Sequence, residues 1–116
     1  MQSGTALESG EVVLVPFSFT DLSQTKRRPV VVLSSRNFND ATNDFICCAL
    51  TSNLRNRRNS VLLDPSELVM GSIPKRSRIK YGKVYTLEKS LIVKALGRVG
   101  PEKLAQVKEG FLSILG

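Results

Sequence analysis

The stretch that decides the fold is Thr25-Lys26-Arg27-Arg28-Pro29-Val30-Val31-Val32-Leu33-Ser34, which joins three cations to a proline and a short apolar strand. Residues 11–17 form another strand candidate one loop earlier, so we expect the two strands to pair as neighbours. That pairing places Arg28 where a polar loop enters a sheet. A guanidinium held there can bind phosphate bidentately, although a run of charges is more often a solvated face.

Further short segments rich in Val, Ile, Leu or Phe predict strands over residues 29–35, 44–51, 59–64, 77–80, 83–86 and 92–99. Residues 64–67 read Asp-Pro-Ser-Glu, which predicts a helix with Asp64 at its N-cap, and residues 70–72 should end it early. A second helix should begin at Pro101. Five residues then share one helical face: Leu104, Val107, Phe111, Ile114 and Leu115.

Many short strands and one closing amphipathic helix indicate a mainly β fold, a small curled barrel with a short mid-chain helix. At 116 residues and 41% hydrophobic composition, the chain predicts one domain over residues 10–116 behind a flexible leader, residues 1–9. We expect the core to hold Val12, Leu14, Val31, Leu33, Ile46, Cys48, Leu50, Leu104, Val107 and Phe111.

The net charge of +7 is concentrated in the middle of the chain, because residues 26–80 hold 11 of the 17 basic residues and 4 of the 10 acidic ones. An acidic partner explains such a field, with nucleic acid ahead of an anionic membrane surface. No apolar run reaches the length of a membrane span, and the first ten residues lack the apolar segment of a signal peptide. We therefore expect a cytoplasmic protein.

The chain contains no histidine, which excludes Ser-His-Asp and Cys-His catalysis and any histidine base. Cys47 and Cys48 are adjacent in a strand, so they point to opposite faces and should be small buried hydrophobes. The carboxylates show no spacing typical of a metal site, and glycine-rich phosphate loops are absent. The sequence therefore predicts neither a metal nor a cofactor.

Polar residues gather at the expected strand ends. Thr51, Ser52 and Asn53 end the third strand, and a hydroxyl there can donate to a phosphate oxygen, although threonine is common in strands. Residues 75–80 place cations on one strand face, and Arg55, Arg57 and Arg58 form a second basic loop. Both suit a nucleic-acid backbone, while a charged edge strand is an equal alternative for residues 75–80.

Three blocks in order resemble the MazF/PemK family of toxin endoribonucleases: Gly10-Glu11-Val12-Val13, residues 28–34, and Ala49-Leu50-Thr51-Ser52. Residues 77–90 and the closing helix are similar to the family's C-terminal part. The resemblance implies an SH3-like barrel that works as a homodimer. It also implies metal-independent cleavage of single-stranded RNA, such as mRNA, by 2′-OH attack, and neutralisation by a cognate antitoxin with an acidic tail.

The same resemblance assigns the catalytic roles to Arg28 and Thr51. The expected RNA-binding residues are Gln24, Lys26, Arg27, Ser52, Asn53, Arg55, Arg76, Ser77 and Lys80. Ser23 stands at an acidic position of the family, and Gly82 stands where some relatives have Asp, so the general base is unassigned. The alternative function is a non-catalytic module on the same barrel that binds nucleic acid or is directed at a gyrase.

Overall fold

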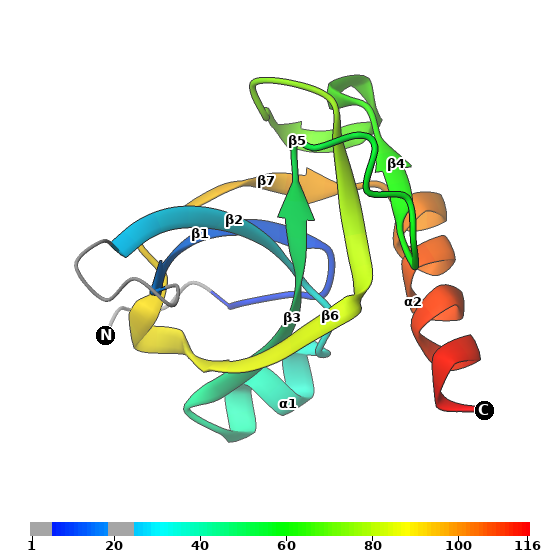
Figure 1. The fold of residues 1–116 in the computed structure, drawn as a ribbon. Helices are drawn as coiled ribbons and strands as arrows, with labels where there is room; N and C mark the ends of the chain where they lie inside the picture. Colours follow the sequence, from blue (N-terminus) through cyan, green and yellow to red (C-terminus); the bar gives the residue numbers. More distant parts are fainter. Residues whose placement is uncertain (1–5, 19–24) are drawn as a thin grey trace.

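Seven antiparallel strands form one curled sheet in the computed structural model, which describes residues 6–18 and 25–116. The strands are β1 (Glu11–Ser18), β2 (Thr25–Val32), β3 (Asp44–Thr51), β4 (Val61–Leu63), β5 (Leu68–Gly71), β6 (Ser77–Glu88) and β7 (Lys94–Val99). Their order in the sheet is β4-β6-β3-β2-β1-β7-β5. Only a 3-10 turn, η1 (Pro65–Glu67), separates β4 from β5, yet these strands occupy opposite ends of the sheet. The sheet therefore curls into a half-barrel (Figure 1), and the prediction of a mainly β fold is confirmed.

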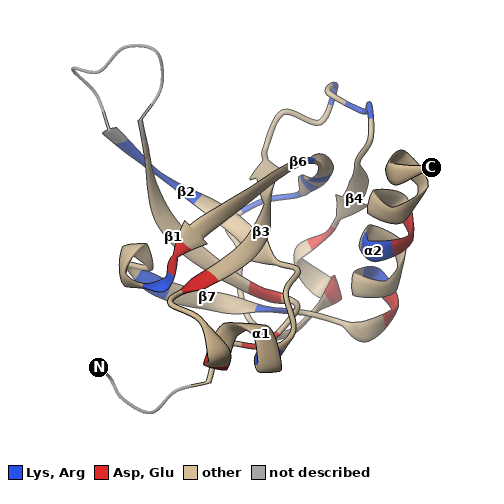
Figure 2. Ribbon diagram, turned by 90° about the horizontal axis from the view of Figure 1, so that it is seen from below, with Lys and Arg blue, Asp and Glu red and all other residues tan. Residues whose placement is uncertain are grey.

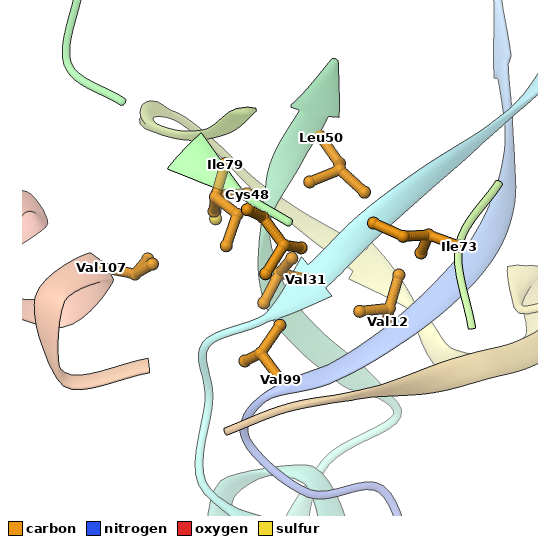
Figure 3. Packing of buried hydrophobic residues seen from close by; sticks show 9 residues of the cluster. Val12, Val31, Cys48, Leu50, Ile73, Ile79, Val99 and Val107 are labelled. Carbon is orange, nitrogen blue, oxygen red and sulfur yellow. The ribbon is translucent and has the colours of Figure 1, made fainter. Parts of the chain in front are cut away.

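The central strands are buried on both faces, because successive side chains of a strand point to opposite sides. Val12, Val31 and Cys48 belong to a cluster inside the curl, which Figure 3 shows together with Val107 of the C-terminal helix. A second cluster on the other face contains Val13 and Cys47, among others. Both cysteines are fully buried in different clusters, as their adjacent positions predicted.

Half of the predicted core is confirmed: Val12, Val31, Cys48, Leu50 and Val107 are buried. The other five are only half-buried: Leu14, Leu33, Ile46, Leu104 and Phe111. Leu33 and Leu104 pack against the edge of the inner cluster, while Ile46 and Phe111 line a shallow cavity beside the C-terminal helix. These five positions therefore lie at the margin of the core and are partly rather than fully buried.

Several predicted boundaries also need correction. β2 begins at Thr25, four residues before the expected start, because residues 25–31 all pair with β1. Residues 68–71, where a helix was expected to end, form β5, since the helix is the single turn η1. The predicted strands 77–80 and 83–86 form one strand, β6, and the short helix α1 (Arg36–Ala41) was not predicted.

The C-terminal helix, α2 (Pro101–Leu115), packs against β6 and β4 (Figure 1). It begins as predicted, with Pro101 in its first turn, and buries Val107. Ile114 and Leu115 are exposed, so the apolar face that contacts the sheet is shorter than predicted. Among the described residues, no helix has the length and apolar character to cross a membrane.

The predicted helix cap at Asp64 is present, although it begins only the turn η1. The Asp64 side chain accepts a hydrogen bond from the backbone N–H of Ser66 at 3.0 Å, and Glu67 accepts one from the backbone N–H of Asp64 at 2.8 Å. Lys103 of α2 lies 3.0 Å from Glu67. The capping box thus also links α2 to the connection between β4 and β5.

Candidate functional site

Arg28 and Thr51 line one cavity of about 380 Å³ at the meeting point of β2, β3 and β6. The strand register explains the proximity, because Val30 of β2 is opposite Ala49 of β3 in an antiparallel pair. Arg28 lies two residues before Val30, and Thr51 lies two residues after Ala49. With a side-chain period of two, both residues therefore reach the same end and the same face of the strand pair.

A large bulge in β6 adds two lysines to this cavity. Cys48 pairs with Val84 while the next residue, Ala49, pairs with Lys80, so residues 81–83 of β6 have no partner on β3. In a regular strand, Lys80 and Lys83 would point to opposite faces. The bulge changes the direction of the side chains that follow it, so both lysines line the cavity.

Gly82 lies at the centre of this bulge and packs closely against Asn59. A Cβ at residue 82 would lie 2.9 Å from Cβ of Asn59, and the backbone N–H of Gly82 donates to the Asn59 carbonyl at 3.3 Å. Any side chain at residue 82 would therefore displace the loop that carries Asn59. The acidic residue that some members of the resembled family have at this position would not fit here without that shift.

Lys80 anchors the loop between β3 and β4 to the sheet. The residue is 4% exposed, and its Nζ donates to Oδ1 of Asn56 at 2.7 Å, to the Asn56 carbonyl at 3.3 Å and to the Arg58 carbonyl at 2.5 Å. Burial is the main cause that lowers the pKa of Lys80, and the positive charges of the nearby Lys83 and Arg78 lower it further. Arg78 adds a bond from Nε to the Leu54 carbonyl at 2.7 Å. These strand cations therefore fix the loop.

The hydroxyl of Thr51 is oriented by the loop that follows it. Its Oγ1 accepts a hydrogen bond from the backbone N–H of Asn53 at 3.1 Å, and Oδ1 of Asn53 accepts one from the backbone N–H of Arg55 at 3.1 Å. With a lone pair of Thr51 engaged in this way, the hydroxyl hydrogen is available to a ligand in the cavity. Thr51 is thus prepared to donate.

Two aromatic residues that the sequence analysis missed form another part of the cavity wall. The rings of Phe17 and Tyr85 meet edge to face, with centroids 5.1 Å apart and an interplanar angle of 65°. An aromatic surface beside cations suits a nucleobase that carries a phosphate. Asn56 and Lys83 are the other polar lining residues that were missed.

The predicted RNA-binding residues are only partly brought together. Lys80 lines the cavity with Arg28 and Thr51, whereas Lys26 and Arg27 are exposed. Figure 2 shows the first part of β2 as a basic, blue segment of the ribbon. Ser52, Asn53 and Arg55 are exposed on the loop after β3, and Gln24 and Ser23 lie outside the described residues.

Arg76 and Ser77 are not among the residues that line the cavity. Arg76 lies 3.7 Å from Asp64, and Ser77 is buried and donates to the Lys75 carbonyl at 3.1 Å. Arg78 and Lys80 both bond to the loop between β3 and β4, as expected for cations on one strand face, but Lys80 is buried while Arg76 is exposed.

The polar groups of the cavity wall are dominated by hydrogen-bond donors. The described lining residues include Arg28, Lys80 and Lys83 but no Asp or Glu. Within residues 6–18 and 25–116, no group of three or more Cys, Asp or Glu side chains could hold a metal ion. The chemistry of this wall suits an anion, and phosphate fits both its charge and its donors.

Comparisons with known proteins identify the family and the fold of the chain. The sequence model of the family described as "PemK-like, MazF-like toxin of type II toxin-antitoxin system" matches residues 8–115. No curated protein sequence matches the chain. Among solved structures, MazE-MazF from Deinococcus radiodurans is similar with 23% identity and a TM-score of 0.76, covering 97% of this chain and 98% of that one.

Two further structures have the same fold. An endoribonuclease in complex with its cognate antitoxin, from a mycobacterial species, has 22% identity and a TM-score of 0.78, with 96% of each chain covered. MazF from Deinococcus radiodurans has 25% identity and a TM-score of 0.71, with 97% of this chain and 99% of that chain covered.

Proposed function

Because this chain belongs to the PemK-like, MazF-like toxin family of type II toxin-antitoxin systems, we propose that it is an endoribonuclease that cleaves single-stranded RNA at the cavity lined by Arg28 and Thr51. One observation carries the proposal. The described wall of this cavity combines three cations with the Thr51 hydroxyl and contains no carboxylate. Such a wall binds a phosphodiester and stabilises additional negative charge on it.

The proposed reaction is attack of a ribose 2′-OH on its own adjacent phosphate. The 2′-oxygen forms a bond to phosphorus, the bond to the 5′-oxygen breaks, and the proton lost by the 2′-OH is balanced by one gained by the leaving oxygen. The products are a 2′,3′-cyclic phosphate and a 5′-OH end. Arg28 would stabilise the doubly negative phosphorane, and the Thr51 hydroxyl would donate to a phosphate oxygen. The described lining residues supply no carboxylate base.

The partners follow from charge and family. Arg55, Arg57 and Arg58 are exposed on the loop beside the cavity, and within the described chain none of them forms an ion pair with a carboxylate. Such a surface suits RNA and also an acidic peptide, as a cognate antitoxin would supply. We propose that the protein acts as a cytoplasmic homodimer whose antitoxin covers this surface.

End-group analysis of a cleaved single-stranded RNA tests the proposal. Arg28→Ala should lower the cleavage rate on the order of a hundredfold to a thousandfold, as expected when one transition-state donor is lost. Thr51→Val keeps the shape and removes the hydroxyl, so it should also slow cleavage. EDTA should have no effect, because the described lining residues include three cations, which repel a divalent metal ion, and no carboxylate to hold one.

Arg36→Ala is the matched control, since Arg36 is an exposed arginine of α1 that pairs with Asp40 at 3.4 Å and does not line the cavity. Urea unfolding of each variant separates loss of activity from loss of fold. Equal cleavage by Arg28→Ala and the unsubstituted protein would refute the assignment of the site.

The absence of a carboxylate from the described wall also favours a second candidate, a module that binds nucleic acid without cleaving it. In that case the unsubstituted protein would bind single-stranded RNA with strong salt dependence and leave it intact. Binding without cleavage would establish this second function.

A further inference from the structure

Asn56 lines the cavity, but its amide oxygen is already engaged by Lys80. Building on the proposed function, we propose that the side-chain NH₂ of Asn56 donates a hydrogen bond to an oxygen of the bound RNA, and that Lys80 positions this group. The residue that contacts RNA is therefore Asn56. Lys80, which was expected to bind phosphate itself, acts through its neighbour.

The chemistry of an ammonium group decides which end of the amide faces the ligand. A protonated lysine has three N–H donors and no acceptor, so it can bond only to the oxygen of an asparagine side chain. The bond from Lys80 Nζ to Asn56 Oδ1 is 2.7 Å long and comes from a residue that is only 4% exposed. A flipped amide would place its NH₂ against this buried cation, which is strongly unfavourable.

The backbone of Asn56 is held as well. Its carbonyl accepts from Lys80 Nζ at 3.3 Å and from Oγ of Ser60 at 3.4 Å, and its N–H donates to the Asn53 carbonyl at 3.3 Å. Lys80 itself is fixed in β6 at the start of the bulge. Among the described residues, no group accepts a hydrogen bond from the Asn56 NH₂. The donor is thus preorganised and is left to a ligand.

The ligand atom must be a hydrogen-bond acceptor, and on RNA this is either a non-bridging phosphate oxygen or a carbonyl oxygen of a base. Arg28 and Lys83 on the same wall place a phosphate nearby, while Phe17 and Tyr85 can contact the attached base. Both sources share the same chemistry, an acceptor oxygen that faces the Asn56 NH₂. The two sources differ in their effect on sequence preference.

Asn56→Asp tests the donor directly. A carboxylate still accepts from Lys80, so the anchor of the loop is kept, but the NH₂ is replaced by an acceptor that repels RNA oxygens. Asn59→Asp is the matched control, because it adds the same charge to the same loop at an exposed residue outside the cavity wall. Asn59 has φ 50°, a left-handed conformation that Asp also tolerates.

Binding of a non-cleavable single-stranded oligonucleotide and cleavage of the matching RNA are measured for both variants. Asn56→Asp should weaken binding and slow cleavage on the order of tenfold to a hundredfold relative to Asn59→Asp, as for a hydrogen bond to a charged group. A uniform loss over all cut sequences identifies a phosphate contact, and a changed set of cut sequences identifies a base contact. Equal binding and cleavage by the two variants would overturn the inference.

A double-mutant cycle tests the role of Lys80. Lys80→Met removes the cation that orients the amide, and Asn56→Ala removes the donor, so the loss of RNA binding in the double variant should be clearly smaller than the sum of the two single losses. Lys80→Arg, which also only donates, should restore most of the binding lost in Lys80→Met. Additive losses would show that Lys80 does not act through Asn56 and would overturn its positioning role.

The proposed function and this inference fail in different ways. If the unsubstituted protein cleaves RNA, and Asn56→Asp and Asn59→Asp bind and cleave RNA equally well, only the inference is refuted. If the unsubstituted protein binds RNA without cleaving it, and the Asn56→Asp variant binds RNA more weakly, the inference stands and the enzymatic function is refuted. A protein that neither binds nor cleaves RNA loses both.

Discussion

Gly110 lies in the middle of α2, where an alanine would normally stabilise the helix by about 1 kcal/mol. The structure predicts the opposite result. A Cβ at residue 110 would lie 2.6 Å from Cε2, 2.7 Å from Cζ and 2.8 Å from Cδ2 of Tyr81. Tyr81 belongs to the bulge of β6 and packs against the inner cluster, so its ring cannot simply move into solvent.

Overpacking of this kind costs roughly 1–3 kcal/mol, which exceeds the gain of about 1 kcal/mol from helix propensity. Gly110→Ala should therefore lower the free energy of unfolding by about 1 kcal/mol, within a range of roughly 0–2. Urea unfolding followed by circular dichroism measures this difference.

The same substitution in a Tyr81→Ala background supplies the control. Without the ring, Gly110→Ala should stabilise the protein by up to about 1 kcal/mol, so the sign of its effect reverses. Stabilisation by Gly110→Ala in the unsubstituted protein would refute the reasoning. An effect of equal size in both backgrounds would also refute it, because the contact with Tyr81 would then be irrelevant.

Three further predictions concern burial and charge. Val107→Ala should lower the free energy of unfolding by about 2 kcal/mol in urea, since it removes two fully buried methyl groups and leaves a cavity. Hydrogen bonds from the backbone N–H of Asp64 and from Lys103 lower the pKa of Glu67. The ionised Glu67 therefore stabilises the folded protein above its unfolded pKa of about 4.3, and this stabilisation is lost as the pH falls through the lower pKa of the folded state. Acid should therefore destabilise Glu67→Gln less than the unsubstituted protein in urea titrations between about pH 5 and pH 3. Burial raises the pKa of Cys47 and Cys48 to about 12, so a thiol reagent at pH 8 should label neither cysteine before unfolding, and fast labelling of the native protein would contradict their burial.

Local patterns predicted the elements whose identity depends on nearby residues. The strand over residues 44–51 was predicted with its observed bounds, because a run of apolar residues is limited on both sides by polar ones. The helix start at Pro101 and the capping box at Asp64 were also evident, since caps depend on residues at fixed short distances. The short length of η1 was not evident from the sequence, because the pairing of β5 with β7 competes with a longer helix.

The candidate site shows the same limit. Arg28 and Thr51 could be brought together from the sequence, because both lie at ends of strands that were expected to share a sheet. Lys83 and Asn56 could not be placed at this site from the sequence. Their positions depend on the bulge in β6 and on the hydrogen bonds from Lys80 to a distant loop. A periodic sequence pattern does not reveal an insertion of three unpaired residues in a strand.

The order of the strands in the sheet also determines how the chain can fold during synthesis. β1 can form a hairpin with β2 early, but its other edge pairs with β7, and Val13 must wait for Ala95 to leave the ribosome. Until then β1 presents an open edge of apolar residues, which is prone to non-native strand pairing. The strands of the cavity are complete by Glu88. The last segment to be made, β7 with α2, therefore closes the second edge of β1 only after all residues of β2, β3 and β6 have been synthesised.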